Sequence, residues 1–222
     1  MKDVQCVLFD LDGTLIDSVP AYFDLMAAML DAVGLPQVPK ALVAEFMTSG
    51  LSVLEKMVPA DRTHQKDELI EQLLAVGRPL SAEMFLHRVQ MIPEVDQLLP
   101  LLAAKGIPIG VVTSTARHVI DRKLLTLERR GLRALLGVII ATEDAPRKKP
   151  APDPLLEGAR QLGVPPQECL YVGDSHVDIR AGRAAGMRTA GVLTGLDDAE
   201  TLQREQPTLL LNNVGDLCPL FS

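Results

Sequence analysis

A short apolar stretch near the start of the chain, followed at once by two acids, constrains the fold more than any other feature. Residues 4–9 read Val-Gln-Cys-Val-Leu-Phe, a pattern typical of a strand buried on both faces of a parallel sheet. Asp10 and Asp12 follow, and Gly13 allows a sharp turn of the backbone. Because open α/β sheets bind ligands at the carboxyl ends of their strands, we expect both carboxylates to point into one crevice there.

Two acids in one crevice repel each other, and this repulsion predicts a bound cation. A hard divalent cation, which prefers oxygen ligands, would remove the repulsion between Asp10 and Asp12. Two ligands do not complete the coordination of such an ion. At least one further acid therefore has to come from elsewhere in the chain.

The hydrophobic pattern along the chain divides it into a helical block and an alternating α/β region. Apolar residues at steps of three and four predict a helix from Val19 that Gly34 ends, and helical periodicity continues to about Arg88 without a convincing strand. Further strands are predicted at residues 108–113, 137–141, 169–172, 189–193 and 208–211, with helical patterns between them. This alternation predicts an α/β fold with a parallel sheet. The predicted core comprises residues 1–17 and 89–222, and residues 18–88 form an inserted helical cap.

Charge and composition narrow the class of partner. With 22 Lys and Arg against 29 Asp and Glu, the net charge of −7 argues against nucleic acid or a membrane surface and favours a small-molecule ligand. No apolar run reaches the roughly 18 residues of a membrane span, and the start of the chain does not read as a secretory signal, so we expect a cytoplasmic protein. The three cysteines are far apart and lack metal-ligand spacing, which predicts free thiols.

Polar residues follow several of the later predicted strands. Thr113 and Ser114 could hold a phosphoryl oxygen, although hydroxyl residues at such a place also cap helices. Lys149, restrained by the proline after it, could place a positive charge on anionic oxygens, although short basic runs are usually solvated loops. Asp174 is the candidate third metal acid, with a helix N-cap as the alternative, and Asp178 follows it one helical turn later.

Taken together, these segments resemble the four motifs of the haloacid dehalogenase superfamily of phosphatases. The segments that carry the resemblance are Asp10-Leu11-Asp12-Gly13-Thr14-Leu15, Thr113-Ser114, Lys149-Pro150 and Gly173-Asp174-Ser175-His176-Val177-Asp178. The resemblance covers essentially the whole chain, and it implies a Rossmann-like three-layer α/β/α core with strand order 3-2-1-4-5-6 and an α-helical cap. Asp17-Ser18-Val19-Pro20, which opens the cap, is similar to the phosphoglycolate phosphatase group in particular.

The resemblance implies roles for the acids. Asp10 resembles the nucleophile that forms an aspartyl-phosphate, and Asp12 resembles the general acid and base that protonates the leaving alcohol and then activates water. The implied cofactor is Mg²⁺, held by the Asp10 carboxylate, the Asp12 backbone carbonyl and Asp174.

It also implies roles for the residues around them. Thr113, the Ser114 amide and Lys149 would neutralise the three transferring oxygens. Asp178 would orient Lys149 or a water molecule. The implied partner is a small phosphorylated metabolite, bound by a monomer or homodimer.

The sequence departs from the family pattern at three places. Pro93-Glu94 stands where relatives usually have Pro-Gly. Thr194-Gly195 stands where an aromatic residue and glycine are frequent, a difference from which the sequence predicts no catalytic consequence. In the predicted cap, Thr48 replaces a common glycine of a loop that reaches into the site of relatives. Thr48 and Ser49 are therefore candidate substrate-binding residues.

Three functions compete on the sequence alone. A phosphatase is favoured because Thr14, Gly173 and Asp178 resemble the phosphatase versions of the motifs rather than those of the phosphosugar mutases of the same superfamily. Asp12 counts against a dehalogenase, which lacks the second acid of the first motif. A binding protein without turnover is the third alternative, although every catalytic position is filled. Phosphoglycolate is the favoured substrate, with a sugar phosphate or a nucleotide as alternatives.

Overall fold

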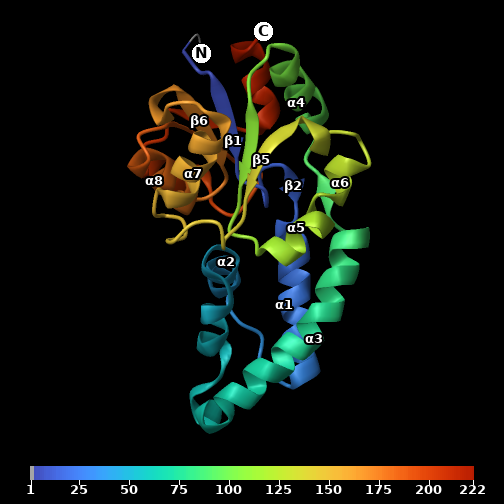
Figure 1. Cartoon of the computed structure of the whole chain (residues 1–222). Helices are drawn as coiled ribbons and strands as arrows, with labels where there is room; N and C mark the ends of the chain where they lie inside the picture. The colour runs from blue at the N-terminus through green and yellow to red at the C-terminus, as the bar shows by residue number, and fades with distance from the viewer. Residues whose placement is uncertain (1–2) are drawn as a thin grey trace. The chain divides into compact units, whose positions relative to one another are not determined.

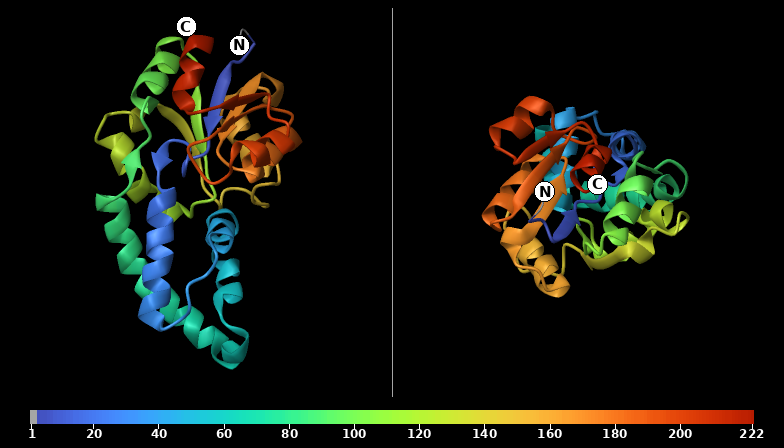
Figure 2. Two further views of the ribbon diagram at one scale, coloured as in Figure 1. Left: turned by 180° about the vertical axis from the view of Figure 1, so that it is seen from behind. Right: turned by 90° about the horizontal axis from the view of Figure 1, so that it is seen from above.

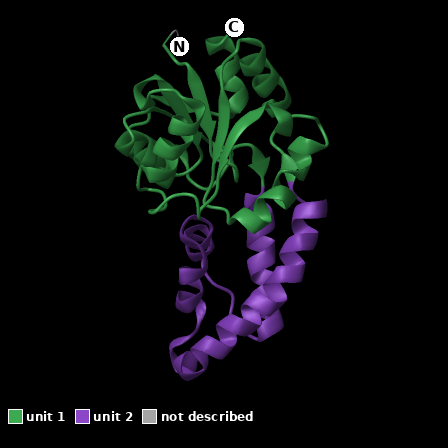
Figure 3. Ribbon diagram, viewed as in Figure 1, with its two compact units in different colours: residues 1–17, 90–222 green, residues 18–89 purple. Residues whose placement is uncertain are grey.

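The computed structural model describes residues 3–222 and divides the chain into two compact units. Unit 1 comprises residues 1–17 and 90–222, and unit 2 comprises residues 18–89 (Figure 3). Unit 1 carries the acids and the motif residues of the later strands.

Unit 1 is built on a six-stranded parallel sheet (Figure 1). Its strands are β1 (Cys6–Phe9), β4 (Ile109–Val112), β5 (Leu136–Ile140), β6 (Cys169–Gly173), β7 (Arg188–Val192) and β8 (Leu209–Leu211). They lie in the order β5-β4-β1-β6-β7-β8, which is 3-2-1-4-5-6 when the six are numbered along the chain. The predicted α/β class with a parallel sheet is confirmed. A separate two-stranded antiparallel sheet joins β2 (Ile16–Asp17) to β3 (Gln90–Met91).

The apolar first strand lies at the middle of this sheet. All four residues of β1 are fully buried, as expected for a strand covered on both faces. Val7 is in register with Ile109 of β4, and Leu8 is in register with Tyr171 of β6. The carboxyl ends of β4, β1 and β6 are therefore neighbours, and the residues after these strands meet at one edge.

Helices cover both faces of the sheet (Figure 2). On one face, Leu155 and Ala181 join a buried cluster with Leu8 and Tyr171, and on the other α4 packs against β4. The helices of unit 1 are α4 (Val95–Ala104), α5 (Arg117–Lys123), α6 (Leu125–Glu128), α7 (Asp153–Leu162), α8 (His176–Ala184) and α9 (Ala199–Arg204), with short 3₁₀ helices η3 (Arg133–Leu135), η4 (Pro166–Glu168) and η5 (Val214–Leu220).

Unit 2 is helical, and none of its residues lies in a strand. Its elements are α1 (Val19–Val33), α2 (Lys40–Ser49), η1 (Gly50–Met57), η2 (Ala60–Gln65) and α3 (Lys66–His87). Gly34 ends α1 in the left-handed conformation, with φ of 68°, which glycine adopts without strain. Helices α1 and α3 pack together, and the rings of Tyr22 and Phe85 meet edge to face at 5.7 Å. Across residues 3–222, no helix combines the length and apolar character needed to cross a membrane.

The Pro93-Glu94 departure from the family pattern has a structural consequence. Glu94 precedes α4 with φ of 68°, in the left-handed region that costs a residue with a Cβ atom roughly 1–2 kcal/mol. A glycine at this position would avoid that cost. Gly215 of η5 packs against the same residue, because a Cβ atom at position 215 would lie 2.6 Å from Glu94 Cβ and 2.7 Å from Glu94 Cγ.

We predict that Gly215→Ala destabilises the protein by about 1–3 kcal/mol because the added methyl group overlaps the Glu94 side chain. In a Glu94→Gly background the penalty should become smaller, since both overlapping Glu94 carbons are gone. Urea unfolding of the two single variants, the double variant and the wild type measures this coupling. An equal penalty in both backgrounds would show that the two residues do not compete for space.

Candidate active site

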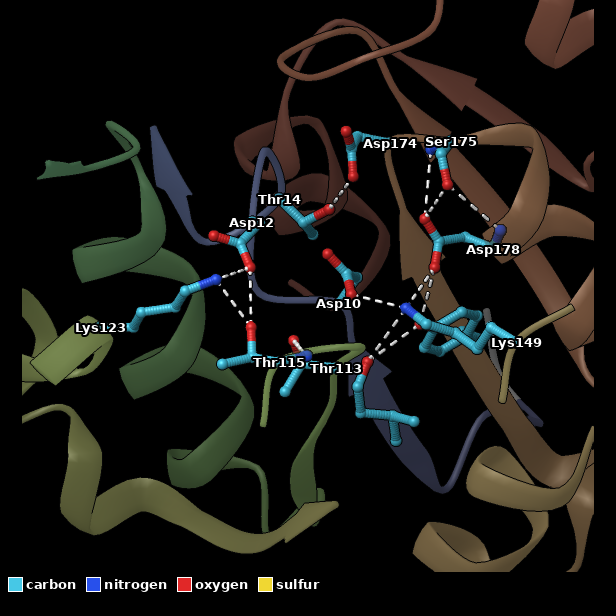
Figure 4. Close-up of polar contacts among 12 residues, drawn as sticks. Asp10, Asp12, Thr14, Thr113, Thr115, Lys123, Lys149, Asp174, Ser175 and Asp178 are labelled. Atoms are coloured by element: carbon cyan, nitrogen blue, oxygen red, sulfur yellow. Dashed lines mark hydrogen bonds and ion pairs between the residues drawn. The ribbon is translucent and has the colours of Figure 1, made fainter. Parts of the chain in front are cut away.

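The carboxyl ends of the three central strands bring the predicted acids and hydroxyls together (Figure 4). Asp10 follows β1, and its N–H donates to Val172 O of β6 at 2.8 Å. Thr113 follows β4, with its N–H donating to Ile140 O at 3.0 Å. Asp174 follows β6, and the side chains of all three residues are buried. The three residues are far apart in the sequence, and they meet because their strands are neighbours in the sheet.

Three buried acids form the centre of the site. Asp10, Asp174 and Asp178 each place one carboxylate oxygen within 4.8 Å of the others. Burial raises the pKa of Asp10 to about 7, and the charges of Asp178 and Asp12 act in the same direction while Lys149 opposes them. Burial, with the charges of Asp178 and Asp10, also raises the pKa of Asp174 well above its usual range. Crowded, desolvated carboxylates of this kind are the donor set that suits a hard divalent cation.

Lys149 lies between two of these acids. Its Nζ donates to Asp10 Oδ1 at 2.6 Å, to Asp178 Oδ1 at 2.7 Å and to the Tyr171 hydroxyl at 2.9 Å. Burial alone would lower the pKa of this lysine, but the charges of Asp10 and Asp178 outweigh burial and hold the pKa well above its ordinary value. The ammonium therefore stays charged beside the carboxylate of Asp10.

Asp178 positions Lys149 and the loop before α8. Its Oδ2 accepts from the Ser175 N–H at 3.2 Å and the Ser175 hydroxyl at 2.6 Å, which completes a capping box at the start of α8. Its Oδ1 accepts from Lys149 and from the Tyr171 hydroxyl at 2.9 Å. Through its two oxygens, Asp178 therefore joins Lys149 and Tyr171 to the start of α8.

The loop after β7 fixes the carboxylate of Asp174. The Leu196 N–H donates to Asp174 Oδ2 at 2.7 Å, and the Thr14 hydroxyl donates to Asp174 Oδ1 at 3.3 Å. A Cβ atom at Gly195 would lie 1.7 Å from Asp174 Oδ2, so only glycine leaves room for the carboxylate. The Thr194 hydroxyl also donates to Gly13 O at 2.6 Å, which ties this loop to the turn after Asp12. The Thr194-Gly195 pair thus has a role that the sequence did not indicate.

Not every predicted site residue lies in this cluster. Ser114 lies in the turn that follows Thr113. Thr48 and Ser49 belong to unit 2, where they end α2, and the Thr48 hydroxyl donates to Glu45 O at 3.1 Å. Their role in binding a substrate stays a prediction.

Three residues of the site were missed from the sequence. Tyr171 is part of an apolar strand, where an aromatic residue is an ordinary core residue, and its hydroxyl also donates to Val112 O at 3.2 Å. Thr115 and Lys123 both contact the Asp12 carboxylate. The Thr-Ser-Thr sequence offered a weak signal for Thr115, whereas Lys123 lies in the charged segment Arg117–Lys123 that reads as a solvated helix.

The fold and the site together define an α/β protein with buried acids, a lysine and hydroxyls at the carboxyl edge of a parallel sheet. Residues 7–192 match the model of the haloacid dehalogenase-like hydrolases, and the chain belongs to this family. The resemblance drawn from the four motifs is therefore confirmed.

Similar proteins cover nearly the whole chain. The phosphoglycolate phosphatase of Yersinia pestis is 35% identical over 224 residues, covering 98% of this chain and 93% of its own. That of Escherichia coli (strain K12) is 30% identical over 236 residues, covering 98% and 92%. A hydrolase from Pseudomonas syringae superposes with a TM-score of 0.80 at 26% identity, covering 97% of this chain and 96% of its own. A predicted phosphoglycolate phosphatase from Haemophilus somnus 129pt, at 24% identity, shares the fold with a TM-score of 0.85 over 100% of both chains.

We predict that Lys149→Met destabilises the metal-free protein by about 3–5 kcal/mol, because it leaves buried carboxylates without their cationic partner. Urea unfolding in the presence of a chelator measures the loss. Lys148→Met is the matched control, since this neighbouring lysine is exposed and its removal should change stability by less than about 0.5 kcal/mol. Equal effects of the two substitutions would mean that Lys149 does not balance the acids.

Proposed function

We propose that this protein is a Mg²⁺-dependent phosphatase that hydrolyses a small phosphomonoester through a phosphorylated Asp10. The observation that carries the proposal is the contact of 2.6 Å between Lys149 Nζ and Asp10 Oδ1, beside the Asp174 carboxylate. It places a permanent positive charge at the carboxylate that would attack phosphorus, where the anionic oxygens of a phosphoryl group need neutralisation. The family and the names of the similar proteins support the same reaction.

The residues present fit the proposed Mg²⁺. Hard oxygen donors would come from the Asp10 carboxylate, the Asp12 backbone carbonyl and the Asp174 carboxylate, and the Asp10 and Asp174 carboxylates each place an oxygen within 4.8 Å of the other. A bound Mg²⁺ would supply electrostatic stabilisation to the charge that develops on the phosphoryl oxygens.

In the first half-reaction, the Asp10 carboxylate attacks phosphorus and the bond between phosphorus and the ester oxygen breaks. Asp12 gives its proton to that oxygen, so the product leaves as a neutral alcohol. Thr113, the Ser114 amide and Lys149 hold the three non-bridging oxygens during the transfer.

In the second half-reaction, the ionised Asp12 takes a proton from a water molecule as that water attacks phosphorus. The bond between phosphorus and the Asp10 oxygen breaks, inorganic phosphate forms, and the Asp10 carboxylate is regenerated. Asp178 keeps Lys149 in place in both steps through its contact of 2.7 Å. The two opening acids thus have separate tasks, one covalent and one in proton transfer.

Phosphoglycolate is the favoured substrate on the names of the similar proteins, with a sugar phosphate or a nucleotide as the alternative. Residues 18–88 would then act as a cap that excludes water from the phosphorylated enzyme, with Thr48 and Ser49 contacting the substrate.

A panel of phosphate esters tests the proposal directly. We expect Mg²⁺-dependent release of inorganic phosphate, fastest from a small ester such as phosphoglycolate, and poor turnover with Ca²⁺, which prefers more ligands and looser geometry. A chelator should abolish the release. Isomerisation of a hexose phosphate without net phosphate release would instead identify a mutase, and no turnover of any ester would favour a binding protein.

The two opening acids should differ in their kinetics. Asp10→Asn should abolish turnover of every ester, because an amide is a very poor nucleophile. Asp12→Asn should spare the first half-reaction with an aryl phosphate, whose phenolate leaves without a proton, and slow the second by about 10²–10⁴. Rapid mixing should therefore show a burst of phenol in Asp12→Asn only. Near-normal turnover in Asp10→Asn would exclude a phosphorylated Asp10.

A further inference from the structure

Asp12 contacts a buried lysine, Lys123, and a threonine, Thr115, and neither of them belongs to the Lys149 network. Lys123, the last residue of α5, has a side chain that is only 2% exposed, and its Nζ contacts Asp12 Oδ2 and Thr115 Oγ1, the latter at 2.7 Å. The Thr115 hydroxyl donates to the same Asp12 oxygen at 3.1 Å. The three side chains form a closed triangle of polar contacts (Figure 4).

Such a lysine is costly as a mere structural residue. Removing an ammonium group from water costs several kcal/mol, and an ion pair in this position offsets that cost only with good geometry. The carboxylate of Asp12, whose side chain is 17% exposed, is less buried than the lysine that contacts it. The chain therefore places a positive charge inside the protein and directs it at a residue with a proposed catalytic task.

The threonine of the triangle is itself held by the backbone of the site. The Thr115 N–H donates to Thr113 Oγ1 at 3.1 Å, and Thr115 O accepts from the Thr142 N–H at 3.1 Å. The turn that presents Thr113 to the crevice therefore also presents Thr115 to Asp12. A displacement of this turn would move both contacts together.

We propose that Thr115 and Lys123 are positioning residues that fix the rotation of the Asp12 carboxylate for proton transfer to the leaving oxygen. The proposal rests on the proposed function, in which Asp12 is the general acid. Both contacts fall on Oδ2, so they hold one oxygen of the carboxylate and thereby set the direction of the other. Proton transfer requires a separation of about 2.6–3.2 Å between heavy atoms, which a carboxylate free to rotate would meet only part of the time.

The inference predicts a dependence on the leaving group. An alkyl phosphate needs a proton on its leaving oxygen, whereas p-nitrophenyl phosphate does not. Misdirecting Asp12 should therefore lower kcat/KM for the alkyl ester more than for the aryl ester. Both esters give the same phosphorylated enzyme. Because kcat/KM reports only the steps up to its formation, the later hydrolysis of this intermediate does not affect the comparison.

The experiment compares Thr115→Val with Thr115→Ser, alongside Lys123→Met and Asp12→Asn, in the full-length protein with Mg²⁺. Valine keeps the shape of threonine without the hydroxyl, and serine keeps the hydroxyl. The measured quantity is the ratio of kcat/KM for the best alkyl phosphate of the panel to that for p-nitrophenyl phosphate. We expect Thr115→Val and Lys123→Met to lower the ratio by about 10-fold or more, part of the 10²–10⁴ of general acid catalysis, and Thr115→Ser to keep it near the wild-type ratio.

The Asp12→Asn variant separates the possible failures. If it lowers the ratio while Thr115→Val and Thr115→Ser give the same ratio, the positioning role is wrong and the proposed function stands. If Asp12→Asn leaves the ratio unchanged, Asp12 is not the general acid and both proposals fall. In the Asp12→Asn background, Lys123→Met should lower the ratio no further, and an additional drop would show that Lys123 acts on the leaving group independently. Should Lys123→Met fail to fold, the two Thr115 variants decide the question.

Discussion

The ion pair between Lys149 and Asp10, supported by Asp178, is the interaction on which the rest of the site depends. Asp10, Asp174 and Asp178 bring negative charge into a largely buried site, and the Lys149 ammonium contacts two of them. An unbalanced carboxylate there would take up a proton, and Asp10 could then not attack phosphorus as proposed. The central position of β1 matters to the same site. Because β4 and β6 lie on either side of β1, Thr113 and Asp174 both come close to Asp10.

The room available to the carboxylates of Asp174 and Asp178 depends on three glycines. A Cβ atom at Gly13 would lie 2.5 Å from Asp174 Oδ2, one at Gly195 would lie 1.7 Å from it, and one at Gly173 would lie 2.4 Å from Asp178 Cβ. Three glycines from separate segments thus leave room for two carboxylates. The absence of side chains lets the backbone approach, and the Leu196 N–H then binds Asp174 directly. Backbone N–H groups therefore help the buried side chains to orient these two acids, at Asp174 through Leu196 and at Asp178 through Ser175.

The sequence predicted the features that local pattern encodes. The buried first strand, the later strands and the helical character of residues 18–88 follow from hydrophobic periodicity, and the motifs identified the family because four separate segments agree. Contacts across the sheet were not predictable in this way. Tyr171 looks like a core aromatic, Lys123 looks like a solvated helix residue, and the role of Gly195 depends on a carboxylate 21 residues earlier in the chain. Each of these residues acts through a partner that only the folded chain brings near.

The two opening acids are each served by a buried lysine from a different part of the chain. Lys149, in the loop before α7, contacts Asp10, and Lys123, at the end of α5, contacts Asp12. A single lysine between the two acids would couple their charges, so a change of protonation at one would be felt directly by the other. Separate partners give each acid its own positive charge, although the charge of Asp12 still raises the pKa of Asp10. In the proposed reaction Asp10 forms the covalent bond and Asp12 transfers the proton, and two lysines allow each carboxylate to be oriented for its own task.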